Sequence, residues 1–169
     1  MLACIGQALH DKLAKTKLFM VGAGAIGCEL LKNYAMLGIG CFGEGCIVLT
    51  DPDVIEVSNL NRQFLFREKH LRKPKASTAA GAAQSMNPEM QGHVVARLDR
   101  VHAGSVEVYS ESFFESLDVV TNALDSVSAR RYVDERCLSA RTPLIDSGTL
   151  GPKGHVQVVL PFRTESYGA

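Results

Sequence analysis

The sequence has no excess of either charge, because 18 Lys and Arg residues balance 18 Asp and Glu residues over its 169 positions. This balance argues against a nucleic-acid or anionic-membrane partner, since both recruit basic surfaces. No apolar run approaches the length that crosses a bilayer, and no internal repeat or low-complexity segment is visible. We therefore expect one soluble domain with a sizeable core.

The five cysteines include no CxxC pair, and their odd number and scatter do not suggest a disulfide framework. They fit a reducing compartment with free thiols, which we take to be the cytoplasm and also the nucleus. The first residues lack the charged start and long apolar segment of a secretory signal. We expect Cys28, Cys46 and Cys137 to be small buried apolar side chains.

The stretch from Lys17 to Asn59 organises the rest of the chain. The apolar run Leu18–Val21 predicts a buried strand, and it is followed by GAGAIG at positions 22–27, the spacing GxGxxG. Gly22 allows a tight turn, Gly24 lets backbone approach a phosphate, and Gly27 lets the next helix pack on the strand. We expect that helix from about Ala25 to Leu37, with Ile26, Leu30, Leu31, Tyr34 and Leu37 on one side and Gly38 closing it.

A second strand at Cys46–Leu49 is followed by Thr50 and Asp51. Asp51 is placed to accept hydrogen bonds from a ribose, and the N-terminus of the preceding helix offers N–H groups to a phosphate. The alternative is a βαβ unit whose glycines serve packing alone, but the strand, helix and acid together favour nucleotide binding.

Beyond this unit, strands and helices alternate. We expect a lead-in helix at 2–16, with Leu2, Ile5, Leu9 and Leu13 on one face, and a long polar connection at 52–74. Three more helices are expected: an alanine-rich helix from Pro74 to 87, a short helix within 105–117 and a helix from Ser126 to about 140. Further strands are expected near 93–98, 118–122, 143–148 and 155–160, with a turn at 150–154. The pattern predicts an α/β fold, a Rossmann-like doubly wound and mostly parallel sheet with helices on both faces and a C-terminal antiparallel hairpin. We divide the chain into the lead-in helix (1–16), a nucleotide-binding domain (17–161) and a final segment (162–169).

Several polar residues follow strand ends, where such sheets bind ligands. They are Asp51 and Asp53 after the second strand, Asn59, Arg62 and Gln63 on the long connection, Lys75 at the alanine-rich helix, and Asp125 before a later helix. Two cations and a carboxylate suit a metal-bound triphosphate, because Arg62 and Lys75 can grip phosphate oxygens and Asp125 can ligate Mg²⁺. Hydride transfer would need less positive charge here.

Each of these residues also has a plainer interpretation. Asp125 could cap the next helix, Arg62 could be a solvated loop charge, and Asn59 could satisfy its own turn. Lys75 could extend an exposed basic patch formed by Arg67, Lys69, Arg72 and Lys73. The functional interpretation gains because all of them are expected at one edge of the sheet.

Five motifs resemble the active adenylation half of ubiquitin-activating enzymes, and the resemblance runs from about Leu2 to Tyr167. They are VGAGAIGCELLKN, TDPDxIExSNLNRQFLFR, KPK before the alanine-rich helix, NALDSVSARRYVDxRC and SGTLGxKGHVQVVLPxxTESY. The resemblance implies ATP and Mg²⁺ as cofactors and ubiquitin or a ubiquitin-like protein as the partner that is activated. In that family the modifier's C-terminal glycine is adenylated, then passed to a cysteine as a thioester and on to a conjugating enzyme.

The resemblance also implies roles by position. Asp51 would bind the ribose, and Asn59, Arg62 and Lys75 would contact the phosphates. Asp125 would hold Mg²⁺, with Asp53 nearby. The loop of Gly22, Gly24, Ala25 and Gly27 would border the adenosine, and Arg100, Val101, Ala123 and Leu124 would border the adenine. We take Arg62, Lys75 and Asp125 as the catalytic residues and add Gln63 to the cofactor-binding set.

The chain stops at Thr164–Ala169, where the family continues into its crossover segment and cysteine domain, and no cysteine here matches the thioester position. We therefore expect a fragment that lacks the cysteine domain, the inactive adenylation half and the domain that recruits the conjugating enzyme. Two alternatives remain. One is an NAD(P)-dependent oxidoreductase domain, which would not need Arg62, Lys75 and Asp125 together; the other is a non-catalytic interaction domain, which would have lost them.

Overall fold

The computed structural model describes residues 2–169, with the side chains of Leu2 and Leu150 outside the description. The elements in chain order are α1 (Leu2–Ala14), β1 (Lys17–Val21), α2 (Ala25–Leu37), β2 (Cys46–Thr50), η1 (Val57–Asn59), η2 (Glu68–His70), α3 (Lys75–Met86), η3 (Pro88–Met90), β3 (Val94–Arg97), η4 (Ala103–Ser105), α4 (Glu111–Glu115), β4 (Val119–Asn122), α5 (Val127–Ser139), β5 (Leu144–Leu150) and β6 (Lys153–Val159). None of the described helices has the length and apolar character that crossing a membrane requires.

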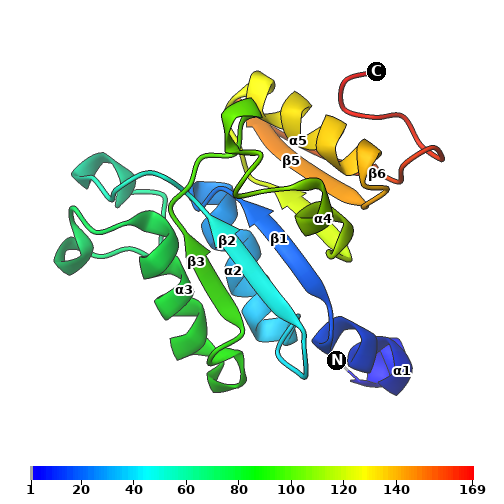
Figure 1. Ribbon diagram of the computed structural model, residues 1–169. Helices are drawn as coiled ribbons and strands as arrows, with labels where there is room; N and C mark the ends of the chain where they lie inside the picture. The colour runs from blue at the N-terminus through cyan, green and yellow to red at the C-terminus, as the bar shows by residue number, and fades with distance from the viewer. Residues whose placement is uncertain (1) are drawn as a thin grey trace.

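The strands form one six-stranded sheet in the order β3-β2-β1-β4-β5-β6 (Figure 1). The strands β1 to β5 pair in parallel, and β6 pairs with β5 in the antiparallel direction. The strand order reverses between β1 and β4, so the carboxyl ends of these two strands form the switch point where doubly wound sheets bind ligands. The predicted fold class is confirmed, including the C-terminal hairpin.

Two apolar cores lie on opposite faces of the sheet, because alternate side chains of a strand point to opposite sides. Leu18 and Met20 of β1 pack with α2 and α3 on one face. Phe19 and Val21 pack with α4 and α5 on the other face. The four side chains from Leu18 to Val21 are at most 3% exposed, so this part of β1 is enclosed by both helical layers.

The lead-in helix is less regular than expected. Gly6 interrupts α1 with φ 76° and ψ 163°, which lie outside the helical region. Leu9 is 46% exposed, so the predicted apolar face does not pack along its whole length. The end of α1 is anchored, because the carbonyls of Leu13 and Ala14 accept hydrogen bonds from Gly40 and Phe42. Figure 1 shows α1 beside the start of β1, away from the carboxyl ends of the strands.

Two further expectations were wrong in detail. The buried side of α2 consists of Gly27, Cys28, Leu31 and Ala35, whereas Leu37 is 41% exposed. Of the residues predicted for the packing side, Leu31 is fully buried and Leu30 and Tyr34 pack against the core, whereas small side chains permit the closest contact with β1. The turn predicted at 150–154 is shorter than expected, because Leu150 already pairs with Lys153 across the hairpin.

The close packing of α2 gives a direct test of the fold. A Cβ at Gly27 would overlap the carbonyl of Gly22, whereas a Cβ at Gly81 in α3 would have no neighbour within 4 Å. We expect Gly27→Ala to lower the free energy of unfolding by about 1–3 kcal/mol. The control Gly81→Ala should raise it by about 0.5–1 kcal/mol, because alanine favours a helix. Urea unfolding of both variants measures this, and an unchanged Gly27→Ala would contradict the packing described.

Candidate functional site

The glycine turn between β1 and α2 is the centre of the predicted site. Gly22 has a φ of 102°, and a Cβ there would lie 2.5 Å from the carbonyl oxygen of Ala123, at the end of β4. The N–H of Ala123 in turn donates to the carbonyl of Val21. The turn therefore touches the end of β4 backbone to backbone, and the packing roles predicted for Gly22 and Gly27 are confirmed.

The N-terminus of α2 is open. Gly24 is the N-cap, no side chain caps this end, and the first turn from Ala25 contains no acidic residue. A Cβ at Gly24 would meet no described atom within 4 Å, so the space beside it is unfilled. Exposed N–H groups next to open space fit a phosphate group, which the positive end of the helix would attract.

Asp51 is already engaged by the protein backbone. One carboxylate oxygen accepts the N–H of Ala23 at 2.7 Å, and the other accepts the N–H of Asp53 at 2.8 Å. The residue is only 6% exposed. Burial raises the pKa of the Asp51 carboxyl, and the two N–H groups partly offset this rise. Asp51 therefore fixes the glycine turn, a role that the sequence analysis did not foresee.

Lys75 opens α3, as expected, and reaches back to the end of β2. Its ammonium lies 2.9 Å from the carboxylate of Asp53, and its backbone N–H donates to the Asp53 carbonyl. Lys75 is 8% exposed, whereas the neighbouring Lys73 is exposed. Lys75 therefore does not belong to the exposed basic patch, and the plainer interpretation of this residue was wrong.

The long connection between β2 and α3 is ordered by short turns. Asn59 is 8% exposed, and its side chain accepts the N–H of Glu56 at 3.0 Å. Arg62 is exposed, and its guanidinium donates to the Ser58 carbonyl at 2.7 Å. Gln63 is 3% exposed, and its Oε1 has no hydrogen-bond partner among the described residues. Asn59 does satisfy its own turn, while the buried Oε1 of Gln63 is left unpaired.

Asp125 lies at the exposed start of the segment that leads into α5. The helix cap is Ser126, whose hydroxyl accepts the N–H of Ala129, so capping does not occupy Asp125. Among residues 2–169, no hydrogen bond or ion pair to the Asp125 carboxylate is present. An exposed carboxylate without a partner can ligate Mg²⁺ together with phosphates and waters.

The structure joins some of the predicted residues and leaves others separate. The glycine turn, Asp51, Asp53, Lys75 and Ala123 form one continuous set of contacts. Arg62 contacts its own loop, Arg100 is exposed, and Val101 is buried in the core beside α4 and α5. No hydrogen bond or ion pair between these three residues and the central set is present in the part of the chain that the structure describes.

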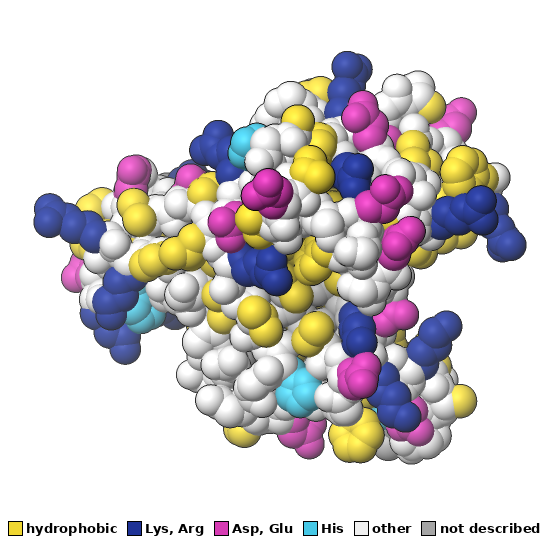
Figure 2. All heavy atoms as spheres, in the orientation of Figure 1, with side chains coloured by type: hydrophobic (Ala, Val, Ile, Leu, Met, Phe, Trp, Pro, Cys, Tyr) yellow, Lys and Arg dark blue, Asp and Glu magenta, His cyan; other side chains and the backbone are white. Residues whose placement is uncertain are grey.

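Two surface hollows lie outside this set. One, of about 500 Å³, is lined by residues of α3 and by Lys69, His70 and Lys73. In Figure 2, Lys, Arg and His side chains gather at the end of the face where the connection between β2 and α3 lies. The other hollow, of about 310 Å³, lies between α2 and the β5–β6 hairpin. Neither hollow contains the predicted phosphate residues.

The described residues contain no group of three or more His, Cys, Asp or Glu side chains that could enclose a metal ion. Magnesium does not need such a cage, because it commonly binds one or two protein carboxylates and completes its shell with phosphates and waters. The donor set at Asp125 therefore fits Mg²⁺ that arrives with a nucleotide, and it does not fit a metal held by the protein alone.

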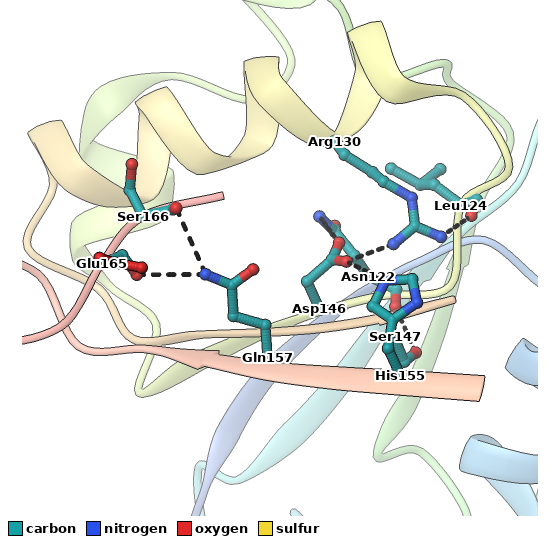
Figure 3. Close-up of polar contacts among 9 residues, drawn as sticks. All are labelled: Asn122, Leu124, Arg130, Asp146, Ser147, His155, Gln157, Glu165 and Ser166. Carbon is teal, nitrogen blue, oxygen red and sulfur yellow. Dashed lines mark hydrogen bonds and ion pairs between the residues drawn. The ribbon is translucent and has the colours of Figure 1, made fainter. Parts of the chain in front are cut away.

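The sequence analysis missed one buried group beside the site. Arg130 of α5 pairs with Asp146 of β5 and also bonds the carbonyl of Leu124 (Figure 3). Arg130 lies in the helix predicted from Ser126 to about 140, and an arginine in a polar helix sequence gives no sign of burial. The sole available signal was an acid, Asp146, inside an apolar strand.

A glycine turn at the switch point of a doubly wound sheet, with an acid at the end of β2, defines a Rossmann-like domain of the nucleotide-binding class. The chain belongs to the ThiF family, which it matches over residues 1–169. It is 56% identical over 167 residues to ubiquitin-like modifier-activating enzyme 1 of Rattus norvegicus and 51% identical over 168 residues to ubiquitin-like modifier-activating enzyme 6 of Mus musculus. The predicted resemblance is thereby confirmed.

The chain spans only 16% of the length of these relatives, while 99% of the chain is covered. Solved structures of Escherichia coli MccB are also similar, one with MccA-N7isoAsn and one with AMPCPP and MccA. Both have a TM-score of 0.81 and 26% sequence identity, and both cover 94% of this chain. The chain covers 44% and 45% of those two chains.

The two bonds to Asp51 predict a stability effect that needs no ligand. In Asp51→Asn, the amide group can accept from only one of the two N–H groups of Ala23 and Asp53. The free energy of unfolding should fall by about 1–3 kcal/mol, because one buried N–H loses its partner. The control Asp99→Asn changes an exposed carboxylate and should have little effect. Equal stabilities of the two variants in denaturant unfolding would disprove the anchoring role.

Proposed function

We propose that the chain is the adenylation module of a ubiquitin-like-modifier activating enzyme. In this proposal it uses Mg·ATP to form an acyl-adenylate on the C-terminal glycine of ubiquitin or a ubiquitin-like protein. The observation that carries the proposal is the glycine turn, which contacts the acid-bearing end of β2 and the end of β4 at the switch point of the sheet. Membership of the ThiF family favours this reaction over hydride transfer to NAD(P).

The phosphates would lie at the open N-terminus of α2, beside Gly24. Lys75 would supply positive charge there, since its ammonium has three N–H donors and the contact with Asp53 uses one. Asp53 would thus orient Lys75 and leave two of its N–H donors for phosphate oxygens. The Asp51 carboxylate still has lone pairs for ribose hydroxyls, because its two backbone contacts occupy only part of its accepting capacity.

Arg62 would contact a phosphate from the long connection. Among the described residues, Arg62 donates two hydrogen bonds, and both come from Nη1. Its Nη2 and Nε therefore remain to bind phosphate oxygens. Asn59 and Gln63 lie on the same connection, and the unpaired Oε1 of Gln63 could accept a hydrogen bond from the ligand. Arg100, Val101, Ala123 and Leu124 would border the adenine.

The reaction would need no protein nucleophile. The carboxylate of the modifier attacks the α-phosphorus, an acyl–phosphate bond forms, and the bond to the leaving pyrophosphate breaks. The protein's contribution is alignment of the reacting groups and stabilisation of the charge by Lys75 and Arg62. Mg²⁺, when bound at Asp125, would neutralise charge on the phosphate oxygens.

The thiol that accepts the acyl group would lie outside this chain. Cys28 is the cysteine in the first turns of α2, but it is fully buried, and burial raises the pKa of its thiol to about 11. Burial also raises the pKa of Cys137, a core residue of α5. Cys4 lies in α1, Cys41 precedes β2 and Cys46 is the first residue of β2. These three cysteines therefore lie toward the amino ends of the strands.

A second adenylation half would cover the apolar surface formed by the outer sides of α2 and β6. Val156 and Val158 of β6 are 68% and 53% exposed. Val156 lines the same hollow as Ile26 and Leu30 of α2, so the two elements present one surface. Large exposed apolar surfaces of this kind mark protein contacts. The conjugating enzyme and the cysteine domain would be further partners of the longer enzyme.

Titration calorimetry of the 169-residue chain tests the proposed ligand. We expect saturable binding of ATP that is strengthened by Mg²⁺ and no comparable binding of NAD⁺. The affinity should be weak, because the proposed second half also contributes to the site. Tighter binding of NAD⁺ than of Mg·ATP would overturn the proposal.

A second titration tests the role of Lys75. We expect Lys75→Ala to weaken Mg·ATP binding about tenfold or more, because a charge-assisted contact worth about 1.5–3 kcal/mol is lost. Lys73→Ala is the matched control, since it removes the same charge from an exposed position two residues earlier. Equal losses in both variants would mean that Lys75 acts only through the general field of the basic connection.

A further inference from the structure

The middle of β5 holds the end of β4 through side chains. The hydroxyl of Ser147 donates to the Asn122 carbonyl at 2.7 Å, and the Asn122 amide donates to Asp146 at 3.1 Å. Asp146 lies between Ile145 and Ser147 on β5 and is 0% exposed. The last residue of β4 is therefore fixed from two directions before the chain enters the segment 123–125.

Arg130 extends this network into that segment. It is 6% exposed, and its two terminal nitrogens have different partners: Nη1 bonds the Asp146 carboxylate and Nη2 bonds the carbonyl of Leu124. Figure 3 shows the guanidinium between these two groups. The backbone of β5 leaves room for it, because a Cβ at Gly148 would lie 2.7 Å from Nη2. The ring of Tyr167 lies 5.8 Å from the guanidinium carbon.

Asp125 is the one residue between two anchored neighbours. The carbonyl of Leu124 is held by Arg130, and the side chain of Ser126 is held by the first turn of α5. Asp125 itself is exposed, and its carboxylate has no partner among residues 2–169. Its position is therefore determined by the backbone on either side, and the bond from Arg130 fixes one of those sides.

A stabilising role alone does not account for this arrangement. A fully buried ion pair contributes little net stability compared with packed apolar residues, because removing both charges from water is costly. The Arg130–Asp146 pair has a second effect that apolar residues would not reproduce, since it orients a donor toward the carbonyl that precedes Asp125. The geometry of a bidentate guanidinium permits both bonds at once.

We propose that Arg130 is a positioning residue, oriented by Asp146, that holds the segment Ala123–Asp125 so that Asp125 can ligate the metal ion of a bound nucleotide. This inference rests on the proposed function, because it assigns a metal-binding task to Asp125. Arg130 touches neither nucleotide nor metal in this assignment. It acts through the carbonyl of Leu124.

The test compares Arg130→Lys with Arg131→Lys in the 169-residue chain. A lysine at 130 can keep the ion pair with Asp146, but its single, flexible ammonium does not reproduce the two separate nitrogens with which the planar guanidinium meets the carboxylate and the Leu124 carbonyl. Arg131 is exposed and adjacent on the same helix, which makes Arg131→Lys a matched control. Calorimetry gives the affinity for ATP with and without Mg²⁺, and hydrogen exchange reports on the amides of residues 123–126.

In Arg130→Lys, we expect the factor by which Mg²⁺ strengthens ATP binding to fall about tenfold. The affinity for metal-free ATP should stay the same. The amides of 123–126 should exchange faster than in Arg131→Lys. A merely structural residue would lower both affinities equally or change only the unfolding midpoint. Either an unchanged Mg²⁺ gain or unchanged exchange at 123–126 would overturn the inference.

Gly148→Ala provides a second variant if Arg130→Lys does not fold. The added methyl group would meet Nη2 of Arg130 and the ring of the half-exposed His155, each at 2.7 Å, and it removes no charge. We therefore expect the same loss as in Arg130→Lys, but smaller. A wild-type chain that shows no Mg²⁺-dependent ATP binding would instead disprove the proposed function. A wild-type chain that binds Mg·ATP while both variants match the control would disprove the inference alone.

Discussion

The close approach of three backbone segments at the switch point of the sheet is the constraint on which the rest of the structure depends. Gly22, Gly27 and Ala123 come so near one another that side chains at the two glycines would collide with carbonyl groups. This contact fixes the direction of α2 and places its N-terminus between the ends of β2 and β4. The acid of β2 then secures the turn through the N–H of Ala23. Packing requirements and ligand requirements therefore coincide at the same few residues.

Much of this architecture could be predicted from the sequence, because its signals are local. Short apolar runs, the glycine spacing and Gly38, which ends α2 in a left-handed conformation, all act within a few residues. The errors arose where the outcome depends on distant partners. The packing side of α2 is set by how closely it meets β1, and the irregularity of α1 is set by Gly6, which the periodicity of the apolar residues does not reveal.

The candidate site was predictable in its members but not in their present contacts. Residues that follow strand ends could be located by counting, which is why Asp51, Asp53 and Lys75 do lie together. Counting does not show that Asp51 bonds backbone N–H groups or that Arg62 folds onto its own loop. It also does not show that Arg130 is buried. Such pairings join segments far apart in sequence, and the residue types alone allow many alternatives.

The sheet is covered unequally, and this has a practical consequence. Helices α2 and α3 cover the first strands on one face, while the outer side of β6 keeps Val156 and Val158 largely exposed (Figure 1). In solution, the chain by itself exposes this apolar surface. Among the described strands, the outer edge of β6 is also unpaired, so it can hydrogen-bond with a strand of another molecule. Self-association at high concentration would then bury the surface that we propose a second adenylation half covers, so dilution series and mild detergents should accompany biophysical work on this chain.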